Sequence, residues 1–334
     1  MQFSLSAMRR HFAASATALR WGAAPDGWLS REEAIMGTAI RVELWADDPD
    51  DGEAAIAAVM AEMHRIDRLL SPYKEQSELS RINREAAQRE VPVGAETMHL
   101  LQRSVQFSQI SDGAFDITYA SLGHLFDYRQ GVRPSDEQAL RARQAIGWQH
   151  LILDPQASTI RFAMQGVRID LGGFAKGHAV DNSIAILQQH GIAHAIVSAG
   201  GDSRVLGDRR GRPWTIAIRD PRRSNGVVAV LPLENVSIST SGDYERYFEE
   251  GGVRFHHLID PHTGESPSAV RSVTILAPDG LTSEALSKTV FVLGAKRGFE
   301  LVESMPDVDA VVVDAAGVLR FSAGLLAGAS ARLQ

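Results

Sequence analysis

The chain has 334 residues, of which 44% are hydrophobic and 22% are charged, proportions typical of globular proteins. Its 34 basic and 41 acidic residues give a formal net charge of −7, which provides no general attraction for nucleic acid or for an anionic membrane. It contains no cysteine, so disulfides, thiolate metal sites and a cysteine nucleophile are excluded. We therefore expect a small-molecule partner or one that is recognised locally.

Residues 1–30 are predicted to form a separate N-terminal segment, either an export signal or a disordered stretch. The twin arginine Arg9-Arg10 precedes a weakly apolar run, Phe12 to Leu19, which is typical of a short export signal. Arg20 follows this run directly and weakens the signal core, so both alternatives stay open. No linker divides residues 31–334, which predicts one domain, and no later apolar run approaches the roughly 20 residues needed to span a bilayer.

The periodicity of apolar residues predicts the secondary structure in chain order. Alternation over 36–46 indicates a strand, and apolar residues at helical spacing indicate helices over 54–70 and 96–110. The polar segment 70–83 between these helices fits neither element. Further strands are predicted over 149–154, 159–163, 167–173, 193–202, 214–220, 227–233, 235–240, 254–260, 272–277, 308–314 and 318–324, and further helices over 174–189, 280–294 and 296–305. Consecutive strands with helices inserted singly or in pairs predict an α+β fold of mainly antiparallel sheets.

The segment IDLGGFAKGHAVD, residues 169–181, carries the densest chemical signal. A predicted strand carries Asp170 and ends in two glycines, and Lys176 falls at the start of the next helix, where backbone amides attract anions. This pattern is consistent with a phosphate or nucleotide site. Taken alone, it is more typical of a strand-helix junction packed tightly through its glycines, because neither GxxxxGK[ST] nor GxGxxG is present.

The segment HHLIDPHTGESP, residues 256–267, gathers three histidines within a turn-rich stretch. Metal ligation and an acid/base role for one histidine are both consistent with this composition, and so is a polar hairpin with surface histidines. No GxSxG motif supports serine hydrolase chemistry.

Taken together and in order, these segments resemble the ApbE family, the FAD:protein FMN transferases. The matching motifs cover nearly the whole chain from Met36. They are MGT, LSPYKEQSELSRIN, GAFDIT, DLGGFAKGHAVD, SAGGD, STSGDYERYF, HHLIDPHTGESP and SEALSKTVFVLG. The resemblance implies an α+β unit related to the T-fold.

The resemblance also implies an activity: cleavage of the FAD pyrophosphate, transfer of FMN to a threonine or serine of an acceptor protein in a Thr-Gly-Ala-type motif, and release of AMP. An FAD pyrophosphatase and a non-catalytic FAD-binding protein are the alternatives. Members of the family commonly act outside the cytoplasmic membrane, so the resemblance favours a periplasmic location, with a cytoplasmic one if the N-terminus is not a signal.

The family motifs imply roles for individual residues. His257 would be the base that takes the proton of the acceptor hydroxyl, and Gly173 would offer its carbonyl to Mg2+. The residues expected to line the FAD site are Met36, Tyr73, Ala114, Phe115, Asp116, Asp170, Lys176 and Ile259.

One helix departs from the family pattern. The family usually reads DALST there, with aspartate and threonine binding Mg2+, whereas this chain has Glu284 and Lys288. Lysine has no acceptor as an ammonium, and Thr289 is turned about 100° away from the family position. Three interpretations follow. In the first, Mg2+ persists, held by Glu284, the Gly173 carbonyl, FAD phosphates and water, and Lys288 points elsewhere. In the second, the Lys288 ammonium occupies the place of the metal. In the third, the site binds FAD without transferring FMN.

Overall fold

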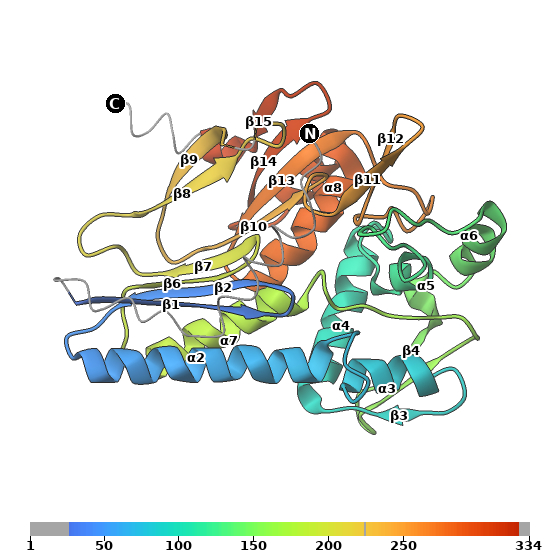
Figure 1. Ribbon diagram of the computed structural model, residues 1–334, viewed down its shortest axis with the longest axis horizontal. Coiled ribbons are helices and arrows are strands. Elements are labelled where there is room, and N and C mark those ends of the chain that lie inside the picture. The colour runs from blue at the N-terminus through green and yellow to red at the C-terminus, as the bar shows by residue number, and fades with distance from the viewer. Residues whose placement is uncertain (1–26, 224, 327–334) are drawn as a thin grey trace.

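The computed structural model describes residues 27–223 and 225–326, so the predicted export segment lies almost wholly outside the described residues. An eight-stranded sheet, antiparallel throughout, forms the centre of the molecule (Figure 1). Its strands in spatial order are β1 (Trp28–Ile35), β2 (Thr38–Trp45), β6 (Ala195–Ala199), β7 (Asp202–Leu206), β10 (Ser237–Gly242), β13 (Val270–Ala277), β14 (Asp309–Asp314) and β15 (Leu319–Phe321). The sheet therefore begins at Trp28, inside the segment expected to precede the domain.

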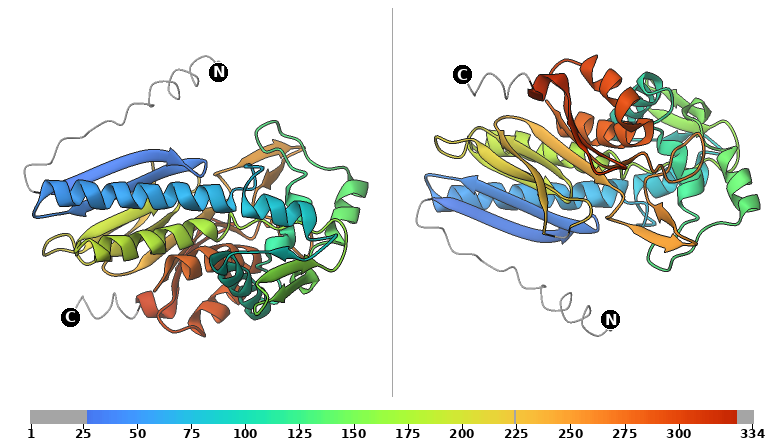
Figure 2. Two further views of the ribbon diagram at one scale, coloured as in Figure 1. Left: turned by 90° about the horizontal axis from the view of Figure 1, so that it is seen from below. Right: turned by 90° about the horizontal axis from the view of Figure 1, so that it is seen from above.

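Three long helices cover one face of this sheet, as the views from below and above show (Figure 2). They are α2 (Pro49–Leu70), α7 (Ala175–Gln189) and α8 (Gly280–Glu303). Helix α2 starts at an aspartate cap, Asp48, with proline in its first turn, and buries an apolar face that includes Ile56 and Met63. Helix α8 packs against β10 and β13, so buried residues occur along most of its circumference.

A second group of elements lies beyond one end of the sheet (Figure 1). It contains a three-stranded sheet of order β3-β5-β4 and the remaining helices. Its elements are α3 (Glu78–Glu85), β3 (Val91–Pro92), α4 (Ala95–Ile110), η1 (Ile117–Tyr119), α5 (Ala120–Gly123), α6 (Asp136–Arg143), η2 (Trp148–His150), β4 (Leu151–Asp154) and β5 (Thr159–Phe162). Most of its buried residues are continuous with the core under the main sheet, so the two groups form one folded unit.

Two hairpins complete the structure. Strands β8 (Trp214–Arg219) and β9 (Val227–Leu233) pair with each other and pack through Trp214 and Leu233 on the sheet face opposite the long helices, where they form a separate small core. Strands β11 (Tyr247–Glu250) and β12 (Val253–His256) form the other hairpin and lead directly to His257.

The predicted α+β fold with mainly antiparallel sheet is confirmed, but the predicted strand over 167–173 is wrong. The backbone there is bonded to groups outside any strand: Ile169 N and O bond to the Asn83 side-chain amide, both at 2.8 Å, and Asp170 N donates to the Ile117 carbonyl at 3.0 Å. The polar segment that fitted neither element contains α3, which Ser77 caps and Leu79 anchors in the core. Within the described ranges, no helix is long and apolar enough to cross a membrane.

Candidate functional site

A cavity of about 900 Å³ lies where the second group of elements meets the end of the main sheet. The residues that line it come from segments distributed along most of the chain. Every predicted site residue except Glu284 lines it: Met36, Tyr73, Ala114, Phe115, Asp116, Asp170, Gly173, Lys176, His257, Ile259 and Lys288. The structure therefore brings together residues that the sequence separates by up to 252 positions (288 minus 36).

Met36 reaches the cavity from the tight turn between β1 and β2. Ile35 pairs with Thr38, so Met36 and Gly37 are the two central turn residues, and their φ values of 53° and 70° are those that a type I′ turn requires. Glycine adopts positive φ freely, but methionine does so at a cost of about 1–2 kcal/mol. Because its backbone is strained and its side chain lines the cavity, Met36 is a candidate ligand contact.

The aromatic residues at the cavity differ in their exposure. Phe115 is buried and packs against Phe107 and Phe174, with ring centroids 6.0 and 5.6 Å away, so it belongs largely to the core. Tyr73, in contrast, is 88% exposed at the rim and is free to stack on a bound ring. Ile259 and Ala114 are buried apolar residues that add to the lining.

Two of the predicted carboxylates organise the loops of the cavity wall. Asp116 accepts hydrogen bonds from Thr118 N at 2.8 Å and Trp148 N at 2.7 Å, and its burial raises the pKa of the carboxyl. Asp170 accepts from Gly172 N at 2.7 Å, and burial also raises its pKa. The Asp116 side chain thus fixes the loop beside Ala114 and Phe115, while Asp170 is placed beside the two glycines that precede α7.

Four charged side chains form an ion-pair cluster at the start of α7: Lys176, Asp202, Glu284 and Lys288. Lys176 Nζ contacts Asp202 Oδ2 at 2.5 Å and also bonds to Glu284 Oε1. Lys288 Nζ lies 3.2 Å from the same Glu284 oxygen. Both carboxylates are almost fully buried, whereas both lysines line the cavity, so the cluster presents its positive ends to a ligand.

Serine hydroxyls support this cluster from β10 and α8. Ser239 Oγ donates to Asp202 Oδ1 at 2.5 Å and lies 3.1 Å from Ser287 Oγ, which in turn lies 2.8 Å from Ser241 Oγ. Burial alone would raise the pKa of Asp202, but the ammonium groups of Lys176 and Lys288 together lower it. Asp202 therefore remains an anion inside the fold.

His257 follows β12 and lines the cavity. Its backbone N donates to Arg246 O at 3.1 Å, and its Nδ1 is buried without a hydrogen-bond partner among the residues described. Burial, reinforced by the charge of Arg246, by His256 and by Lys288, lowers the pKa of His257 to about 3. The imidazole is consequently neutral at pH 7, which is the form that accepts a proton.

Sequence reasoning missed two residues of this site. Asp202 is the last residue of the motif SAGGD, which the sequence identifies only as a glycine turn after a strand. The ion pair between its carboxylate and Lys176 was not predicted. Arg246 is exposed and lines the cavity, and its guanidinium has no bonding partner in the described part of the chain. Its position beside the HHLID segment depends on the β11–β12 pairing, which the spacing of the two motifs does not reveal.

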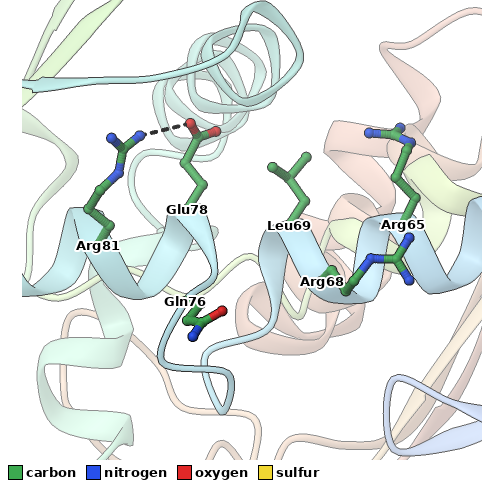
Figure 3. Close-up of a pocket in the computed structure, with 6 residues that line it drawn as sticks. All are labelled: Arg65, Arg68, Leu69, Gln76, Glu78 and Arg81. Carbon is green, nitrogen blue, oxygen red and sulfur yellow. Dashed lines mark hydrogen bonds and ion pairs between the residues drawn. The ribbon is translucent and has the colours of Figure 1, made fainter.

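A second hollow of about 510 Å³ lies at the junction of α2 and α3 (Figure 3). Figure 3 shows its lining residues on the end of α2, on the loop after it and on α3. Two of its arginines already bind carboxylates, Arg65 with Glu62 and Glu96, and Arg81 with Glu78. None of the predicted site residues lines this hollow.

The chain is similar to known proteins over most of its length. A sequence model described as the ApbE family matches residues 36–312. A curated FAD:protein FMN transferase of Treponema pallidum (strain Nichols) is 31% identical over 316 residues, covering 89% of this chain and 87% of the relative. One from Vibrio cholerae (serotype O1, strain ATCC 39541) is 35% identical over 254 residues, covering 72% and 75%.

Solved structures are similar over nearly the whole chain as well. The crystal structure of the ApbE protein from Thermotoga maritima superposes with a TM-score of 0.83 at 32% identity, covering 90% of this chain and 98% of the other. The flavin transferase ApbE from Vibrio cholerae superposes with a TM-score of 0.80 at 27% identity, covering 90% and 99%.

Proposed function

The chain belongs to the ApbE family, and we propose that it is an FAD:protein FMN transferase. In this proposal the large cavity binds FAD and a surface threonine or serine of an acceptor protein receives the FMN. The observation that carries it is the juxtaposition of an aromatic and apolar wall, two lysines and a neutral histidine around one cavity. Its volume of about 900 Å³ lies near the upper end of the ~300–1,000 Å³ range for ligand pockets, which suits a dinucleotide.

The cavity offers different surroundings to the parts of FAD. Tyr73 and the apolar residues of the wall suit its flat rings, while Lys176 and Lys288 suit the pyrophosphate. The guanidinium of Arg246, which has no partner among the described residues, adds positive charge that acts on His257. Phosphoryl transfer depends mainly on positioning and on charge stabilisation, and these residues supply both.

His257 acts as the base in the transfer step. The acceptor hydroxyl oxygen forms a bond to the FMN phosphorus, the bond from that phosphorus to the bridging oxygen breaks, and AMP leaves with the bridging oxygen. The hydroxyl proton passes to the imidazole of His257. The pKa of about 3 is that of the ligand-free site, and a bound pyrophosphate raises it because nearby negative charge favours the imidazolium.

The residues around Glu284 do not fit Mg2+. Glu284 Oε1 receives both lysine ammonium groups, and Oε2 accepts from Gly177 N at 2.7 Å. Thr289 donates its hydroxyl to Ala285 O at 2.9 Å and is buried, so it turns away from the cavity. Within the described ranges, no group of three or more His, Asp or Glu residues could hold a metal ion. The proposed mechanism therefore contains no step through a metal.

Intact-mass spectrometry of an acceptor protein tests the transferase. The acceptor carries the Thr-Gly-Ala-type motif and is incubated with FAD and the protein; we expect its mass to increase by one FMN. An acceptor whose target threonine is replaced by alanine is the control and should stay unmodified. An unmodified wild-type acceptor, in the presence of protein that has bound FAD, would contradict the proposal.

A further inference from the structure

The side chain of Lys288 occupies the space between the two residues expected to hold the metal. A methyl group placed on Gly173 would lie 3.6 Å from Lys288 Cε and 3.7 Å from Cδ, so the aliphatic part of the lysine runs against the glycine loop. Its Nζ lies 3.2 Å from Glu284 Oε1. Lys288 therefore does not point elsewhere: it lies between Gly173 and Glu284, with its charge at the cavity.

The two lysines of the ion-pair cluster are bonded differently. Lys176 has short contacts with both Asp202 and Glu284, which use two of its three N–H donors. Lys288 has one contact of 3.2 Å to Glu284 and a weak one of 3.5 Å to Ser287 Oγ. At least one N–H of Lys288 is therefore left for a ligand in the cavity that it lines.

The charges of the cluster explain why this ammonium matters for an anion. Asp202 and Glu284 contribute two negative charges, and Lys176 and Lys288 contribute two positive ones, so the cluster is neutral. Without Lys288 it would carry a net charge of −1 beneath the cavity and would repel a pyrophosphate. With Lys288 the cluster carries no net negative charge to repel a polyanion.

We propose that the Lys288 ammonium is the built-in cation of this site and binds the FAD pyrophosphate in place of a divalent metal ion. This inference rests on the proposed function and specifies its chemistry further. During transfer, Lys288 donates a hydrogen bond to the phosphate oxygens as negative charge develops on the departing AMP, and it keeps its proton. The bonds that form and break are those of the transfer step, and no metal enters the balance.

FAD binding, measured by quenching of flavin fluorescence, tests this directly and does not depend on turnover. For the wild-type protein we expect the same affinity in EDTA and in Mg2+. Lys288→Met keeps an unbranched side chain that is one atom shorter but removes the charge, and should weaken FAD binding by roughly 10- to 100-fold in both buffers. Lys288→Arg should retain most of the affinity.

Lys288→Thr separates two effects on FAD binding: the loss of the lysine charge and the possible return of a metal ion. It frees one contact of Glu284 and adds a hydroxyl oxygen, so FAD affinity should fall in EDTA and recover in part with Mg2+. Mn2+ paramagnetic resonance should detect bound metal in the FAD complex of this variant but not of the wild type. Lys296→Thr, the same change at an exposed position of α8, is the matched control and should alter neither result.

The outcomes separate the two proposals. If the wild type binds FAD tightly in Mg2+ and weakly in EDTA, or binds Mn2+ stoichiometrically, a metal is used despite Lys288 and this inference fails while the transferase stands. If the wild type binds no FAD in either buffer, the proposed function fails as well. Thermal unfolding of each variant shows whether a loss of affinity reflects a loss of folding.

Discussion

Gly177 on α7 and Gly280 on α8 pack backbone against backbone: a methyl group at Gly177 would lie 2.2 Å from Gly280 O, and one at Gly280 would lie 2.5 Å from Gly177 O. This contact lets the two helices start side by side. Asp181 of α7 accepts from Gly280 N, at 2.8 and 2.9 Å, and Glu284 of α8 accepts from Gly177 N at 2.7 Å. The close approach therefore brings Glu284 into contact with Lys176.

We predict that Gly177→Ala destabilises the protein by roughly 1–3 kcal/mol, because the added methyl meets backbone that cannot rotate away. FAD affinity should fall too, since separating the helices moves Glu284 away from Lys176. Gly94→Ala, where the nearest atom to the new methyl is 3.8 Å away and φ is −66°, is the control. Urea unfolding measures both, and equal stabilities would show that the helices separate at no cost.

The stability of the protein should depend on pH through His257. The pKa is about 3 in the fold, against an ordinary value of 6.5, so the unfolded chain binds the proton more readily between these values. The contribution is fully present above pH 6.5 and is lost as the pH falls toward 3. Between pH 7.5 and 5 the loss is about 2 kcal/mol.

Urea unfolding of His257→Asn at both pH values checks this. We expect the variant to lose about 2 kcal/mol less than the wild type over the same interval. Burial lowers the pKa of His256 as well, so part of the pH dependence should remain. In the acceptor assay the same variant should bind FAD and transfer little FMN. An unchanged transfer rate would remove His257 from the mechanism.

Substitution of Met36 tests whether this residue is kept in the strained turn because its side chain contacts FAD. Met36→Asn places a residue that tolerates positive φ in the turn, but it removes an apolar side chain that packs against the core. We expect these effects to offset each other to within about 1 kcal/mol. FAD affinity should fall because the side chain at the cavity is lost. A more stable variant with unchanged FAD affinity would mean that Met36 serves only the turn.

The sequence predicts what is local or strongly patterned. Helix α2 can be predicted because its apolar residues recur at helical spacing. In α8 the backbone is non-helical at Gly294, which is where the sequence predicts that one helix ends and the next begins. The segment around Ile169 was misassigned because its apolar alternation is that of a strand, while its backbone partner is the side chain of Asn83, 86 residues earlier.

The residues of the site also fall into those that local sequence motifs predict and those that only the fold brings together. Motif resemblance identified eleven of the residues that line the cavity, including Lys176 and His257, because each lies within a recognisable short segment. The ion-pair cluster could not be predicted, since Asp202 meets Lys176 only through the pairing of β7 within the sheet and its packing on α7. In the sequence, Lys288 is only a departure from the metal-binding pattern of the family. Its function as a cation can be inferred only from its position between Gly173 and Glu284 in the structure.

The central claim is that FMN passes from FAD to a protein hydroxyl rather than to water. The most direct measurement is the ratio of AMP released to FMN attached, followed together in one reaction with the acceptor protein. We predict a ratio of one throughout the time course, and no AMP release when the acceptor threonine is replaced by alanine. AMP released in excess of attached FMN, or without an acceptor, would contradict the account and identify a pyrophosphatase.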